Sequence, residues 1–192
     1  MKKILFTLLA AVAAPAFAQA SGAGFTQRDI NQQERIEQGL KSGSLSTREA
    51  GGLEREESHV DKMESSALRD GKVTPAEQAR INAAQDKLSR DIGRDRHNGV
   101  TGNPNSVSSQ RMQADVQRNV NQEQRIQQGM ASGQLTNHEA GKLQSGQAHV
   151  DHAEAHAARN GHVSGAEQAH VQHAENVQSR HIYRQKHDAQ TK

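Results

Sequence analysis

Histidine is the residue type whose number and spacing in this chain suggest chemistry. The chain has 11 histidines, and all but two lie in its last third. Five follow helical spacing and would line helix faces: His149, His152 and His156 at i, i+3 and i+7, and His170 and His173 at i, i+3. Imidazole groups at such spacing are ligands for Zn²⁺, Cu²⁺ or Ni²⁺. The sequence therefore predicts a transition-metal site formed by these five residues.

The two histidine faces meet if the chain forms a helical hairpin. A turn near Gly161 brings His152 and His156 level with residues 170–173. With Val150 taken as the direction of the core, the first histidine face lies on the flank or solvent side of its helix. We therefore expect an open site that binds loosely, unlike a buried structural zinc site. Acidic neighbours that could add an oxygen ligand are Asp151, Glu154 and Glu175.

An internal repeat sets the frame for these residues. Residues 31–98 align with residues 121–188 at a constant offset of about 90, without a gap, and nearly half of the aligned pairs are identical. The matches concentrate on glycine, aliphatic and glutamate positions. The repeat also offers an alternative to metal binding, in which the histidines are ordinary solvated surface residues. Several histidines of the second copy stand where the first copy has other polar residues. His138, His152, His162 and His170 align with Arg48, Lys62, Lys72 and Arg80.

A short unit, G-x-[LV]-[ST]-x-x-E, occurs twice in each copy and predicts a junction between helices. Glycine suits the left-handed position that ends one helix, and Ser or Thr followed three residues later by Glu forms a capping box for the next. Pro75 falls at a first helical position, where its missing N–H costs nothing. The four units begin at Gly43, Gly71, Gly133 and Gly161.

The apolar residues between these junctions follow the helical period, and no run reads as a strand. We expect an all-α protein of two tandem three-helix modules, 28–97 and 114–188, joined by a flexible linker over 98–113. The linker is predicted from its Gly, Asn, Pro and Ser content. Aliphatic residues are few, so we also expect one module to dock on the other, or a homodimer. The six helices are expected at about 28–41, 47–69, 75–96, 114–131, 137–159 and 165–187.

Calcium binding and catalysis find no support in the motifs. Residues 70–77 match the second half of an EF-hand loop, but the earlier ligand positions fall on Ser66 and Leu68, so no calcium binding is expected. The repeated glutamates are explained by helix capping, and neither G-x-S-x-G nor H-E-x-x-H occurs. We therefore expect a protein that is not an enzyme.

The N-terminal sequence, the charge balance and the absence of cysteine limit the cellular location and the classes of partner and site. Lys2 and Lys3, an apolar stretch over 4–17 and an A-x-A site ending at Ala18 predict a signal peptide over 1–20. We expect export to the periplasm, with no membrane span after cleavage. Without Lys2 and Lys3 the 24 basic residues become 22, which balances the 22 acidic ones, and aromatic residues are scarce, so no nucleic-acid partner is expected. The chain has no cysteine, which excludes disulfides and thiolate metal sites.

The motif R-I-x-Q-G-[LM]-x-S-G-x-L-[ST]-x-x-E-A-G-x-L, followed by H-V-D and [DN]-G-x-V-[ST]-x-A-E-Q-A, resembles a family of small exported proteobacterial helical proteins of unknown function. Most of those have one copy, and this chain is similar to a tandem version. A fainter resemblance links Leu135-Thr136-Asn137-His138-Glu139 to the L-T-x-x-Q motif of Spy/CpxP-type periplasmic proteins, with Glu in place of Gln. This second resemblance implies a stress chaperone.

Two functions follow as expectations. The first is a periplasmic, non-enzymatic protein that binds or buffers divalent transition metal through its histidine-rich second module. The alternative is a stress-response chaperone or interaction module that uses its amphipathic helices to bind unfolded or envelope proteins.

Overall fold

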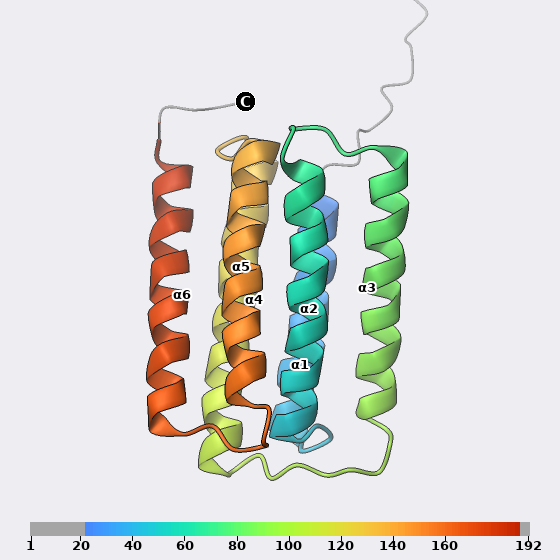
Figure 1. Ribbon diagram of the computed structural model, residues 1–192, viewed down its shortest axis with the longest axis vertical. Helices are drawn as coiled ribbons and strands as arrows, with labels where there is room; N and C mark the ends of the chain where they lie inside the picture. The colour runs from blue at the N-terminus through green and yellow to red at the C-terminus, as the bar shows by residue number, and fades with distance from the viewer. Residues whose placement is uncertain (1–21, 189–192) are drawn as a thin grey trace, which may run out of the picture.

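The computed structural model describes residues 22–188, which form six helices arranged side by side (Figure 1). No strand occurs within this range, so the predicted all-α class is confirmed. The predicted signal peptide, 1–20, lies outside the described residues. The helices are α1 (Gly22–Ser42), α2 (Thr47–Leu68), α3 (Pro75–Asp95), α4 (Val107–Ser132), α5 (Asn137–Ala157) and α6 (Gly165–Lys186).

The junction chemistry read from the sequence is confirmed at all four places. Each capping box has both of its hydrogen bonds, one from the Glu backbone N–H to the Ser or Thr side chain and one from the cap backbone N–H to the Glu carboxylate. The glycine before each box is left-handed, with φ between 75° and 83°. Local capping therefore fixes where α2, α3, α5 and α6 begin. The pairs are Ser46–Glu49, Thr74–Glu77, Thr136–Glu139 and Ser164–Glu167.

The connection between the repeats differs from the expected linker. Ser106 caps α4, which begins at Val107, so residues 107–113 are helical. The rest crosses one end of the bundle (Figure 1), and the Gly102 N–H donates to the Gly43 carbonyl over 2.9 Å. The connection thus packs against the α1–α2 junction. Helix α1 also starts earlier than expected, at Gly22.

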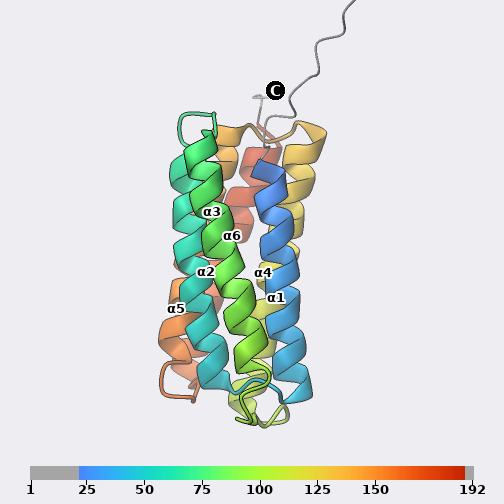
Figure 2. The ribbon, with the colours of Figure 1, turned by 90° about the vertical axis from the view of Figure 1, so that its right-hand side faces the viewer.

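The two repeats pack into one bundle. Its centre is formed by α2 against α5 and α1 against α4, so that both main contacts join one repeat to the other. Helix α3 packs on α1 and α2 (Figure 2), and α6 packs on α4 and α5 at the opposite edge (Figure 1). Paired helices run in opposite directions, since α2 rises while α5 descends in Figure 1. The repeats are therefore related by an approximate two-fold axis across the bundle.

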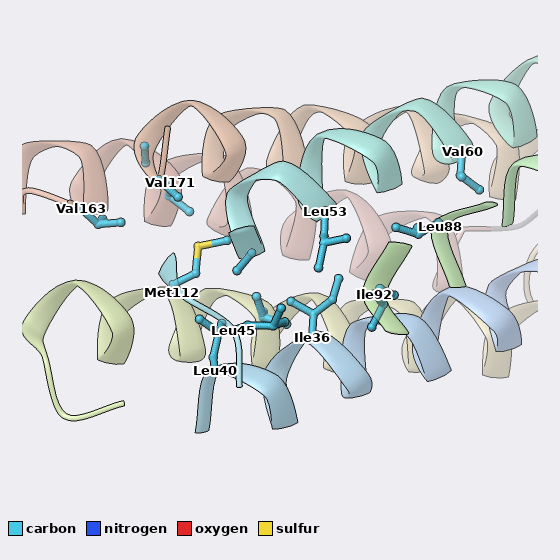
Figure 3. Packing of buried hydrophobic residues seen from close by; sticks show 14 residues of the cluster. Ile36, Leu40, Leu45, Leu53, Val60, Leu88, Ile92, Met112, Val163 and Val171 are labelled. Carbon is cyan, nitrogen blue, oxygen red and sulfur yellow. The ribbon is translucent and has the colours of Figure 1, made fainter. Parts of the chain in front are cut away.

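The apolar core is shared in the same way. Figure 3 shows Ile36 and Leu53 of the first repeat in one cluster with Met112, Val163 and Val171 of the second. Each of these side chains is at most 1% exposed. The expected docking of one copy on the other is thus the arrangement that the structure shows. None of the described helices contains a stretch long and apolar enough to cross a bilayer.

Small residues bring α2 and α5 close together. A Cβ on Gly51 would lie 2.5 Å from the Cβ of Ala158, and one on Gly141, its counterpart, would lie 3.0 Å from the Cβ of Leu68. A Cβ contact of 2.5 Å essentially never occurs, so Ala158 would have to shift, and a contact of 3.0 Å is tighter than nine in ten real ones. This close approach leaves little space between the helices for anything except the side chains that face the interior.

Candidate metal centre

The side chains that face the centre of the bundle include an unusual number of acids. On α2 they follow at i, i+3, i+7 and i+10 as Glu54, Glu57, Asp61 and Glu64, on the face that also buries Leu53. Helical geometry places all of them toward the same partner helices. Ten interior acids are at most 2% exposed, and burial raises the pKa of each: Asp29, Glu54, Glu57, Asp61, Glu64, Asp115, Glu123, Asp151, Glu154 and Glu175.

Asp29, Asp61 and Glu64 form the first of two compact groups, which we call the Asp29 centre. One carboxylate oxygen from each lies within 4.8 Å of the other two. Gln85 of α3 holds the group in place, because its Nε2 donates to Asp29 over 2.8 Å and to Glu64 over 3.0 Å. Gln144 of α5 donates to the other Glu64 oxygen over 3.2 Å. The Asp29 centre thus has acids from two helices and amides from two more.

Glu54, Asp151 and Glu154 form the second group, the Glu54 centre, with the same spacing of oxygens within 4.8 Å. Asn119 of α4 donates to both Glu154 oxygens, over 3.0 and 2.9 Å, and to Asp151 over 3.3 Å. Gln33 of α1 donates to Glu54 over 2.8 Å. Its three acids come from both repeats, since Glu54 is on α2 and the others are on α5.

The two centres are related by the repeat, but acids and amides have changed places between them. Asp61 and Glu64 align with Asp151 and Glu154, so this D-x-x-E pair is common to both centres. Five of the other interior acids align with an amide in the other copy, and Asp115 aligns with Phe25. The exchanged pairs are Asp29 with Asn119, Glu54 with Gln144, Glu57 with Gln147, Glu123 with Gln33, and Glu175 with Gln85.

Several interior oxygens have no hydrogen-bond donor. Both carboxylate oxygens of Glu57 and both of Asp61 lack a partner, as does Oδ2 of Asp29. None of the described lysines and arginines is buried, and the ion pair nearest the interior is from Arg118 Nη1 to Glu175, 2.9 Å. Buried carboxylates without a counter-charge are strongly disfavoured. The interior therefore needs either protons or cations.

The pKa values of the interior acids also show that burial without a counter-charge disfavours their ionised forms. Burial raises the pKa of Asp29 to about 7 and that of Glu54 to about 8, although hydrogen bonds from Gln85 and Gln33 act in the opposite direction. For Glu57 the pKa is raised well above its usual range, first by burial and then by the charges of neighbouring acids, Asp29 foremost. A cation among these groups would favour their ionised forms and lower each pKa.

The ligand atoms define the class of cation. Every side-chain ligand in both centres is an oxygen, which suits hard ions such as Ca²⁺, Mg²⁺ and Mn²⁺. The amides can contribute as well, because the side-chain oxygens of Gln85, Gln144 and Asn119 have no hydrogen-bond partner. A half-turn of each amide would replace its N–H₂ by its oxygen. Each centre could thus offer more oxygens than its three carboxylates provide.

The predicted histidine ligands lie elsewhere. All five are exposed, and no group of three close ligands within residues 22–188 includes a histidine. His156 and His170 do come together, since both line a surface groove between α5 and α6, whereas His149, His152 and His173 are outside its lining. The acids expected to assist them, Asp151, Glu154 and Glu175, are buried in the interior instead.

Sequence reasoning missed the interior acids because charged residues are normally assigned to the solvated face of a helix. A signal was nevertheless present. Glu54, Glu57, Asp61 and Glu64 share the helical stripe of Leu53, and acids persist or turn into amides at the aligned positions. Exchange between acid and amide, rather than with Lys or Ser, is typical of positions that are held in a hydrogen-bond network.

Comparison of the chain with models of protein families, with curated proteins and with solved structures finds no match in any of the three. The interior geometry is therefore what indicates the class of site.

Proposed function

We propose that this protein binds hard divalent cations inside its helical bundle, one in the Asp29 centre and one in the Glu54 centre. The observation that carries the proposal is the pair of buried carboxylate triads whose oxygens converge within 4.8 Å. The orphaned oxygens of Asp61 and Asp29 support it, because they are buried and have no donor to accept from. Ca²⁺ and Mn²⁺ are the ions whose ligand preferences fit best.

This proposal revises the expected class of metal and the expected absence of calcium. That expectation considered only the junctions, where Asp70 accepts from the Lys72 N–H and Glu77 caps α3. The D-x-x-E pairs on α2 and α5 supply acids of a different kind, buried and facing one another. Di-metal carboxylate proteins place comparable i, i+3 pairs in the core of helix bundles, although theirs include histidine.

The biological role that fits these centres is binding or buffering of cations without catalysis. Export to the periplasm remains part of the proposal and is supported by the N-terminal sequence alone. The chaperone alternative is supported less well, since the apolar faces of the helices are buried within the bundle. The exposed large hydrophobic residues of the described range are Val100, Val107 and Tyr183, which belong to different segments.

Titration of the chelator-treated chain with Mn²⁺ tests the proposal. We expect two ions per chain, one for each triad, and displacement of Mn²⁺ by Ca²⁺. Glu64→Gln should remove the first ion and Glu154→Gln the second, because each removes one anionic ligand while retaining the shape of the side chain. Glu56→Gln, on the same helix but half-buried and paired with Lys87, is the matched control and should retain both. A chain that binds neither ion at neutral pH would refute the proposal.

A further inference from the structure

A groove on the outside of the second repeat combines two histidines with a carboxylate. It lies between the last turns of α5 and the first turns of α6 and has a volume of about 330 Å³. His156 is on α5 and His170 is on α6. The hairpin expected from the sequence would bring these two residues together in this way. The groove is lined by Ala153, His156, Ala157, Ala166, Glu167 and His170.

Glu167 is held in this groove by helix capping. Its Oε2 accepts from the Ser164 N–H over 2.8 Å, and its own N–H donates to the Ser164 hydroxyl over 3.2 Å. The hydrogen bonds from Ser164 lower the pKa of Glu167, and the nearby His162 and His156 contribute in the same direction. An ionised carboxylate therefore lies close to His156, fixed by a motif whose first role is structural.

The alanines give the groove its floor. Ala153 and Ala157 on α5 and Ala166 on α6 leave the space that larger side chains would fill. The α2–α3 groove of the first repeat contains Met63 at the place of Ala153, and its volume of about 420 Å³ is the larger of the two. His156 and His170 lie on the two helices that form the groove, and their rings would have to turn to reach one ion together with Glu167, since these three do not form a group within 4.8 Å.

The equivalent groove of the first repeat lacks this chemistry. There Ser66 and Arg80 stand in place of His156 and His170, while Glu77 corresponds to Glu167. Lys62 also lines it, so two cationic side chains surround a single acid. His59 and Lys62 in that lining correspond to His149 and His152, which do not line the groove of the second repeat.

We propose that the α5–α6 groove is a separate site for a borderline transition ion, Zn²⁺, Ni²⁺ or Cu²⁺, bound by His156, His170 and Glu167. Two imidazoles and a carboxylate match the ligand preferences of these ions, and solvent completes the coordination because the groove is open. The site is independent of the buried centres, whose oxygen ligands select a different class of cation. The chain would thus sort two classes of metal between its interior and its surface.

Titration of the full chain with Ni²⁺ in excess Ca²⁺ tests this site, because Ca²⁺ keeps the buried centres occupied. We expect one Ni²⁺ ion at this groove, and replacement of His156 and His170 together by Gln should weaken its binding at least about tenfold. His181→Gln, an exposed histidine on the same helix α6, is the control and should change the affinity less than about twofold. Binding should also weaken in acid, because a protonated imidazole cannot bind a metal ion.

A reciprocal variant makes the test sharper. Ser66→His with Arg80→His in the first repeat builds the same three ligands beside Glu77, and should create a second Ni²⁺ site of similar affinity. Cu²⁺ bound to the unmodified chain should show nitrogen coupling from two imidazoles by electron paramagnetic resonance. Unchanged Ni²⁺ affinity in the His156/His170 variant would overturn the proposal. That result would leave the buried centres unaffected, since their test uses Mn²⁺ and different residues.

Discussion

Asp61 on α2 and Asp151 on α5 are counterparts in the two repeats, and each side chain is 1% exposed. Burial raises the pKa of Asp61, and interaction with the carboxyl group of Asp151 opposes that shift. Asp61 belongs to the Asp29 centre and Asp151 to the Glu54 centre. Two buried carboxyl groups that interact in this way must share a proton or lie beside a cation, because their negative charges repel. This pair therefore connects the two centres, and the charge state of one affects the other.

The cation-free protein, kept in chelator, should become less stable as the pH rises. Ordinary acid denaturation has the opposite direction, since stability is then lost as the pH falls. The folded-state pKa is about 7 for Asp29 and about 8 for Glu54, above the values of about 4 for unfolded chains. Such groups stabilise the fold below the unfolded pKa, and this contribution is lost as the pH rises through the folded pKa. We expect the melting temperature in chelator to fall between about pH 5 and pH 8. A melting temperature that rises over this range would contradict the pKa shifts.

Bound cations should restore the stability that the cation-free protein loses as the pH rises. At about pH 8, Ca²⁺ or Mn²⁺ should raise the melting temperature of the unmodified chain in proportion to the logarithm of ion concentration, as linkage requires for a ligand bound by the folded state. Thermal unfolding followed by circular dichroism measures both effects. The same titration at about pH 5 should give a smaller increase, because protons then compete for the carboxylates.

Glu57→Gln should stabilise the cation-free protein. Both oxygens of Glu57 are buried without a partner, and its counterpart in the second repeat is already Gln147. Because burial and neighbouring acids raise the pKa of Glu57, folding at neutral pH must either bind a proton there or bury an unpaired charge. Glutamine avoids both costs and should raise the free energy of unfolding by about 1 kcal/mol or more. Urea unfolding in chelator measures this, with Glu56→Gln as the neighbouring surface control. A loss of stability would show that Glu57 has a partner in solution.

Adjacent glycines on α2 offer a test of the close approach between repeats. Gly51→Ala places a methyl group against Ala158 and should cost roughly 1–3 kcal/mol of stability. Gly52→Ala meets nothing within 4 Å and should instead stabilise the helix by about 0.5–1 kcal/mol. Equal effects of the two substitutions, measured by urea unfolding, would argue against the α2–α5 packing described above.

Loss of a capping box should have a modest, local cost. Thr136→Ala removes the acceptor of the Glu139 N–H, 3.2 Å away, and the hydroxyl that donates to the Glu139 carboxylate over 2.7 Å. We expect about 1 kcal/mol less stability in urea unfolding. Thr101→Ala, in the exposed connection between α3 and α4, serves as the control and should have almost no effect.

Helix boundaries could be read from the sequence because capping is local. The Ser or Thr and the Glu of each box are three residues apart, so the α2, α3, α5 and α6 starts were predicted at the residues where they occur. The start of α4 was missed because Ser106 lacks a Glu three residues later and caps with its side chain alone. A Gly- and Asn-rich segment before it made the whole stretch resemble a linker.

The interior could not be read in the same way, because it depends on contacts between residues far apart in the chain. Gln85 and Asp29 are on α3 and α1, and Gln144 reaches Glu64 from the other repeat. Taking Val150 as the direction of the core correctly placed His149, His152 and His156 outside. The same reasoning treated acids as solvated, since a buried carboxylate is stabilised only by partners that periodicity does not reveal.

The exchange of acids and amides between the repeats has a consequence for how such an interior arose. In a symmetric pair of identical short chains, every interior position would occur twice, so each buried acid would add two negative charges to the interior. Joining two copies in one chain removes that constraint, because Asp29 can remain an acid while its counterpart Asn119 becomes a neutral donor to Asp151 and Glu154. Covalent fusion thus allows one half to supply hydrogen bonds to the charges of the other, and lets two formerly identical pockets diverge in affinity.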